Sequence, residues 1–206
     1  MALFNLPNSL TLLRILLVPV FTYYFLAGEY RIALAIFVIT GLTDVVDGYL
    51  ARRLQLKTNL GAALDPAADK LLMFVTFIVL AMRDLVPAWL AVLVIFRDLW
   101  IIGGLAVIKF SHIPIRFRPS RLSKLTTFFQ LQTIFLAFFL TFLRSERPAS
   151  LMAWEPYLAT LLTWVIYAAA LLTVASGIHY TRVGWEMYRE GKRAALSPEK
   201  TEAGRQ

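Results

Sequence analysis

Long apolar stretches separated by short polar connections form the hydropathy pattern of this chain. A helix needs about 20 apolar residues to cross a bilayer. Turn-forming residues such as Gly28, Pro87 and Pro148 lie between the stretches. The pattern predicts an all-α integral membrane protein with six transmembrane helices, at about 8–27, 31–52, 59–82, 86–109, 122–143 and 155–180.

The chain changes character after residue 180. Arg, Lys and Glu become frequent there, and Gly184, Gly191 and Pro198 interrupt the run. No linker rich in Ser or Gly divides the preceding residues. We therefore expect one membrane-embedded domain over residues 1–180 and a basic cytoplasmic extension over residues 181–206, helical at first and disordered toward its end.

Composition agrees with a membrane location. Hydrophobic residues make up 59% of the 206 residues and the mean hydropathy is +0.66, whereas soluble domains are about 45 to 50% apolar. The chain has no cysteine. Any metal must therefore be held by oxygen ligands or by one of the two histidines.

The 21 Lys and Arg residues are distributed unevenly. Fourteen of them lie in the connections after the second and fourth segments and in the C-terminal extension: Arg52, Arg53, Lys57, Lys109, Arg116, Arg118, Arg121, Lys124, Arg182, Arg189, Lys192, Arg193, Lys200 and Arg205. By the positive-inside rule this side, with both termini, faces the cytoplasm. The net charge of +8 is thus a topology signal, and we expect no nucleic-acid partner because the aromatic residues lie within the apolar segments. The lack of a transit-like leader or a cleavable signal favours a bacterial inner membrane.

Four aspartates interrupt the second and third apolar segments: Asp44, Asp47, Asp65 and Asp69. An ionised carboxylate in a transmembrane helix costs about 2.5 to 3.5 kcal/mol on insertion scales and usually marks a functional site. At 100° per residue each pair shares one face of its helix. Because the connection between the helices is short, we expect the two faces to meet in a pocket that opens to the cytoplasm.

Carboxylates gathered in this way need compensating cations. Without thiol ligands, Mg²⁺ or Mn²⁺ fits the hard oxygen donors best, and four carboxylates can hold one ion or a pair. The four negative charges of these aspartates favour two divalent ions. Gly48, Ala51 and Gly61 beside the aspartates leave room for a polar ligand, although small residues also serve helix packing.

The residues from Asp44 to Asp69 follow the fixed spacing D-x2-D-G-x2-A-R-x8-G-x3-D-x3-D. This pattern is similar, without departure, to the signature of the CDP-alcohol phosphatidyltransferases. The resemblance implies six transmembrane helices with an amphipathic N-terminal start and a homodimer. It also implies an enzyme that transfers the phosphatidyl group of CDP-diacylglycerol to an alcohol and releases CMP.

The resemblance further assigns roles to single residues. Asp44, Asp47 and Asp65 would bind the metal, while Asp69 would be both a metal ligand and the general base for the acceptor hydroxyl. The CDP-lipid site would be lined by Gly48, Ala51, Arg52 and Gly61.

Cations elsewhere in the chain are the candidates for binding an anionic, glycerol-containing acceptor. Arg97 lies well inside the fourth segment, so it either binds the acceptor or pairs internally with Asp98. Lys124 and Arg118 follow in the basic connection and the next segment. We expect all three cations to contact the acceptor, with contact to lipid headgroups as the alternative for Arg118.

Two branches of the family compete for the acceptor. The start of the chain, from Asn5 to Arg14, is similar both to CMP-forming cardiolipin synthases and to phosphatidylglycerophosphate synthases. Arg97-Asp98, Gly103-Gly104 and the run from 119 to 130 are more similar to the cardiolipin synthases. We therefore expect phosphatidylglycerol as acceptor and cardiolipin as product, with glycerol 3-phosphate as the alternative acceptor.

Two other functional classes also explain part of the pattern. A membrane cation transporter would place carboxylates in the bilayer, but the chain shows no inverted repeat and its Gly, Ala and Arg positions suit a pyrophosphate. A nonenzymatic lipid-binding protein would need the basic connections without the four aligned aspartates. The enzyme hypothesis explains both the basic connections and the four aligned aspartates.

Overall fold

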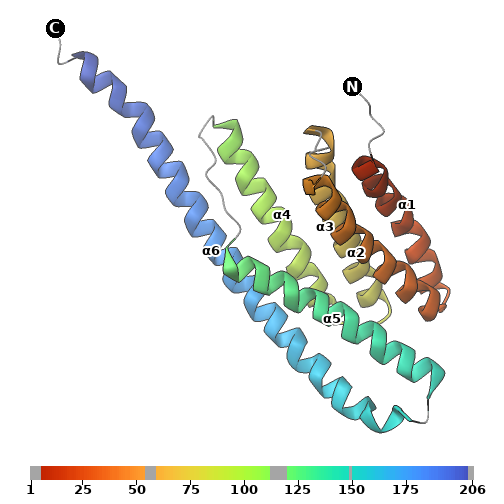
Figure 1. Ribbon diagram of the computed structural model, residues 1–206. Coiled ribbons are helices and arrows are strands. Elements are labelled where there is room, and N and C mark those ends of the chain that lie inside the picture. Colours follow the sequence, from red (N-terminus) through yellow and green to blue (C-terminus); the bar gives the residue numbers. More distant parts are fainter. Residues whose placement is uncertain (1–5, 54–58, 112–119, 149, 204–206) are drawn as a thin grey trace. The chain divides into compact units, whose positions relative to one another are not determined.

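The computed structural model describes residues 6–53, 59–111, 120–148 and 150–203. Within these ranges the side chains of residues 6–11, 44–53, 59–67, 109 and 194–203 lie outside the description. The described residues form helices and no strand, which confirms the all-α prediction (Figure 1). The elements are α1 (Leu6–Leu26), α2 (Tyr30–Arg53), α3 (Asn59–Met82), α4 (Ala88–Phe110), α5 (Arg121–Glu146), a 3₁₀ turn (Met152–Trp154) and α6 (Glu155–Ala203).

Each predicted apolar segment coincides with one of these helices. Helix α6 contains 49 residues and continues without a break past residue 180, so the C-terminal extension begins as a helix, as expected. In the described part of the chain, three stretches are long and apolar enough to cross a membrane, namely Ala88–Ile108, Arg121–Glu146 and Met152–Arg193. Leu12–Leu26 and Tyr30–Thr43 are shorter apolar helices. The protein is thus a helical membrane protein, and six crossings remain a prediction.

The helices divide into two compact units, which are described separately. Unit 1 contains residues 1–91 and 134–162, and unit 2 contains residues 92–133 and 163–206. Helices α4, α5 and α6 each contribute one part to each unit.

An aromatic cluster forms the core of unit 1. Phe21 and Phe25 of α1 lie edge-on to Phe138 of α5, with ring centroids 5.8 and 5.2 Å apart. Phe37 of α2 lies 5.5 Å from the same Phe138 ring. Because Phe21, Phe25 and Phe138 are almost fully buried, and such pairs add about 0.5 to 1.5 kcal/mol beyond area burial, the cluster ties three helices together.

A tight turn joins α1 to α2 in unit 1. Gly28 has a φ of +86°, a left-handed conformation that glycine adopts without a steric penalty. The amide of Glu29 donates to the carbonyl of Tyr24 and that of Gly28 to the carbonyl of Phe25, which is the Schellman pattern of a helix end. Helix α1 therefore ends sharply and packs against both α2 and α3.

Candidate functional site

The aspartate pattern lies on two consecutive helices, as predicted. Asp44 and Asp47 belong to α2, and Asp65 and Asp69 belong to α3. Of these four side chains the structure describes only that of Asp69. The side chains of the other predicted donor-site residues lie outside the described residues: Asp44, Asp47, Asp65, Gly48, Ala51, Arg52 and Gly61. Their meeting in one pocket, and the metal cluster among them, remain predictions, and the described side chains alone contain no group of three acidic or His ligands.

Asp69 is paired with an arginine that the sequence analysis did not assign to the site. Nη1 of Arg14 in α1 donates to Oδ1 of Asp69 in α3 at 2.5 Å. Arg14 is 1% exposed, whereas 47% of the Asp69 side chain is exposed. The pair thus joins a buried cation to a carboxylate that solvent can reach, both within unit 1. The signal in the sequence was the isolated Arg14 inside an apolar segment, which requires a counter-charge.

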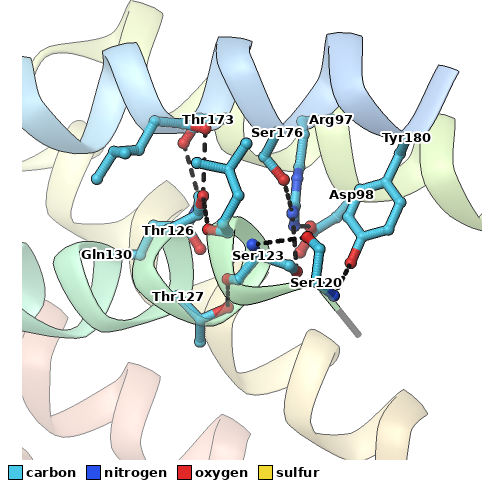
Figure 2. Close-up of polar contacts among 12 residues, drawn as sticks. Arg97, Asp98, Ser120, Ser123, Thr126, Thr127, Gln130, Thr173, Ser176 and Tyr180 are labelled. Atoms are coloured by element: carbon cyan, nitrogen blue, oxygen red, sulfur yellow. Dashed lines mark hydrogen bonds and ion pairs between the residues drawn. The ribbon is translucent and has the colours of Figure 1, made fainter. Parts of the chain in front are cut away.

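Arg97 lies at the centre of a polar network in unit 2, to which α4, α5 and α6 all contribute (Figure 2). Its Nη1 donates to Oδ1 of Asp98 at 2.5 Å. Its Nη2 donates to Oγ of Ser123 in α5 at 3.1 Å and to Oγ of Ser176 in α6. Arg97 and Asp98 are 5% and 3% exposed. The internal pair that the sequence left open for Arg97 is therefore present, and an acceptor role stays a prediction.

Tyr180 covers the guanidinium from α6. The Arg97 Cζ atom lies 5.6 Å from the centroid of the Tyr180 ring, which is within cation–π range. The Tyr180 hydroxyl accepts a 3.4 Å hydrogen bond from the backbone amide of Ser120, and Ser120 Oγ accepts one from the amide of Ser123. Ser120 thus caps the first turn of α5 while that turn is held near Arg97 (Figure 2).

Lys124 and Arg118 are the two other predicted acceptor residues. Lys124 is exposed on the first turn of α5 and directly follows Ser123, the hydrogen-bond partner of Arg97. An acceptor role for Lys124 stays a prediction. Arg118 lies outside the described residues.

An apolar groove of about 920 Å³ runs along α4 and α6 in unit 2. Aromatic and aliphatic side chains line most of it, with Gly103, Gly104 and Gly184 leaving space between the two helices. A neighbouring hollow of about 360 Å³ is lined in part by Arg97 and Arg182. Tyr180, which stacks on Arg97, also lines the larger groove. A buried cation and a surface suited to hydrocarbon thus lie side by side.

Comparison with known proteins adds independent information. The probable cardiolipin synthase (CMP-forming) of Drosophila melanogaster is 35% identical over 149 residues, which cover 65% of this chain and 46% of that protein. The CDP-diacylglycerol–glycerol-3-phosphate 3-phosphatidyltransferase of Bacillus subtilis is 43% identical over 116 residues, covering 49% of this chain and 60% of that protein. The protein of the same name from Rickettsia typhi is 38% identical over 133 residues, covering 62% and 72%. This chain spans less than two thirds of the length of the first two relatives.

A sequence model of CDP-alcohol phosphatidyltransferases matches residues 4–175 of the 206. The match includes α2 and α3, which carry the whole aspartate pattern, and the two helices that hold Arg14 and Arg97. The chain belongs to the CDP-alcohol phosphatidyltransferase family.

Proposed function

We propose that this protein transfers the phosphatidyl group of CDP-diacylglycerol to an alcohol acceptor and releases CMP. The observation that carries the proposal is the complete aspartate pattern from Asp44 to Asp69, located on α2 and α3 within the family match. Relatives named for cardiolipin synthesis and for transfer to glycerol 3-phosphate both support this chemistry.

The donor half of the reaction is assigned to the aspartate helices. The donor set consists of carboxylate oxygens alone, which suits Mg²⁺ or Mn²⁺, held as a pair by Asp44, Asp47, Asp65 and Asp69. Such ions neutralise a pyrophosphate and stabilise charge that develops on the attacked phosphorus. Gly48, Ala51, Arg52 and Gly61 would contact the CDP-lipid, with the guanidinium of Arg52 on a phosphate.

Asp69 is the proposed general base. Its carboxylate, 47% exposed, is accessible to an incoming hydroxyl group, which a fully enclosed carboxylate would not be. When the acceptor oxygen attacks phosphorus, Asp69 would accept the hydroxyl proton, and CMP would leave as the phosphoanhydride bond to the phosphatidyl group breaks.

Phosphatidylglycerol is the proposed acceptor, with cardiolipin as product. Arg97, Lys124 and Arg118 would contact its phosphodiester. The apolar groove along α4 and α6 supports a lipid acceptor, since acyl chains need an apolar surface and Tyr180 connects the groove with Arg97. Glycerol 3-phosphate is the alternative acceptor, favoured by the Bacillus subtilis and Rickettsia typhi relatives.

The membrane arrangement follows from charge and helix length. We propose six crossings over residues 1–180, an amphipathic start and both termini in the cytoplasm, with residues 181–206 as a cytoplasmic extension. The bacterial relatives support a bacterial membrane protein. An inner-membrane location with the active site facing the cytoplasm is proposed from the distribution of Lys and Arg. A homodimer is proposed from family membership.

An acceptor panel tests the proposal. Purified protein is incubated with CDP-dioleoylglycerol, Mn²⁺ or Mg²⁺, and phosphatidylglycerol, glycerol 3-phosphate, serine or inositol in separate reactions. CMP release is measured and the lipid product is identified by mass spectrometry. We expect CMP and cardiolipin with phosphatidylglycerol. Absence of CMP with every acceptor would refute the transferase, and phosphatidylglycerophosphate as the sole product would select the alternative acceptor.

A further inference from the structure

Arg14 is among the most completely buried large side chains in the described part of the molecule. It lies in the apolar helix α1, 55 residues before its partner Asp69 in α3. Removing a charged group from water carries a penalty of several kcal/mol, which a close counter-charge offsets. The 2.5 Å contact from Nη1 to Asp69 Oδ1 supplies such a counter-charge.

Arg14 and Asp69 differ in solvent exposure, and this determines which of them a ligand can contact. At 1% exposure, the Arg14 side chain is closed off from any ligand that approaches from solvent. At 47% exposure, the Asp69 carboxylate is open to such a ligand. Through its described contact, Arg14 therefore acts on a bound molecule by way of Asp69.

We propose that Arg14 is a positioning residue that holds the Asp69 carboxylate in its reactive orientation. The inference rests on the proposed function, in which Asp69 is the general base. A hydrogen bond from a fixed guanidinium to Oδ1 restricts rotation of the carboxylate and so sets the direction of its oxygens. Without Arg14 the carboxylate would sample orientations in which proton transfer from the acceptor is ineffective.

Kinetics of Arg14→Met measure this effect. Loss of a residue that orients a ligand or a catalytic group typically costs about 10- to 100-fold. We expect kcat for CMP release to fall by that factor while KM for CDP-diacylglycerol changes by less than about twofold. Arg14→Lys retains the charge without the planar guanidinium, so its kcat should lie between those of Arg14→Met and the wild type.

Arg83→Met is the control, with the difference that Arg83 is exposed and Arg14 is buried. Arg83 also links α3 to α1, because its Nη2 donates to the backbone carbonyl of Leu26, but its described contacts include no carboxylate. Its substitution should leave kcat near the wild-type value. A wild-type kcat for Arg14→Met, or an equal loss in both variants, would overturn the positioning role.

Combination with Asp69→Asn separates positioning from a general packing defect. If Arg14 acts through Asp69, adding Arg14→Met to Asp69→Asn should lower kcat by less than about threefold, since coupled residues are not additive. A drop as large as that caused by Arg14→Met alone would refute the proposal.

Thermal unfolding in EDTA provides a readout that needs no turnover. Arg14→Met leaves a partly buried carboxylate without its guanidinium, whereas the double variant removes both charges and should have the higher Tm of the two. If the decrease in Tm of the double variant equals the sum of the decreases in Arg14→Met and Asp69→Asn, the two residues are uncoupled and the proposal is wrong. Because this result is independent of CMP release, failure of the Arg14 proposal and failure of the transferase proposal give different outcomes.

Discussion

Replacement of Arg97 by Met should destabilise the protein strongly. The substitution leaves Asp98, 3% exposed, without its guanidinium partner at 2.5 Å, and it removes the donor to Ser123 and Ser176. Removal of one partner from a buried ion pair costs about 3 to 5 kcal/mol. For a chain of about 150 to 250 residues each kcal/mol shifts Tm by about 2 to 4 °C. The expected loss for Arg97→Met is therefore about 6 to 20 °C.

The assay is thermal unfolding of the full chain in detergent, followed by circular dichroism. Arg144→Met is the control, because Arg144 also forms an ion pair, with Glu155, but the two side chains are 55% and 24% exposed. Exposed pairs contribute about 0 to 1 kcal/mol, so this variant should lose less than about 4 °C.

The double variant Arg97→Met/Asp98→Leu removes both charges from the same site. It should regain part of the Tm lost in Arg97→Met, since an apolar pair leaves no buried charge to compensate. A Tm for Arg97→Met within the range of Arg144→Met would refute the assignment of Arg97 to a buried, structurally required pair.

Three further predictions concern the proposed reaction. Asp69→Asn should lower CMP turnover about 100-fold or more, the lower end of general-base contributions, and should impair CDP-lipid binding less than turnover; near-normal turnover would remove Asp69 from the base role. Asp44→Ala or Asp47→Ala should weaken Mn²⁺-dependent CMP binding, measured by calorimetric titration, and an unchanged affinity would contradict metal binding there. Gly104→Leu places a side chain in the groove, where a Cβ at Gly104 meets no atom within 4 Å. It should raise KM for long-chain phosphatidylglycerol more than for a short-chain analogue, and equal effects on both lipids would exclude the groove as an acyl site.

The positions of the helices could be predicted closely because local chemistry fixes their ends. Gly28 and Pro87 stand where α1 has ended and α4 is about to begin. The end of α6 could not be found in this way. Hydropathy falls after residue 180, but a helix continues as long as its backbone is satisfied, and Gly184 costs only about 1 kcal/mol relative to Ala.

The partners in the polar sites were harder to predict than the sites themselves. The pair of Arg97 with Asp98 was one of the two roles that the sequence left open for Arg97, and it is present. Ser123 and Ser176 come from two other helices of unit 2. Arg14 and Asp69 are 55 residues apart, and one sequence without relatives carries no information on which of several acids an isolated arginine meets.

The length of α6 has a consequence for how the protein fits bilayers of different thickness. The candidate span Met152–Arg193 has 42 residues, about twice the number that one crossing requires, so its length alone does not set which residues lie at the bilayer centre. Its position is instead fixed along the axis by polar contacts, with Thr173 accepting from Gln130 of α5 and Ser176 accepting from Arg97 of α4. A shift of α6 by one turn would break both contacts. Adjustment to a thinner or thicker membrane should therefore occur by tilting of α4, α5 and α6 together rather than by sliding of α6.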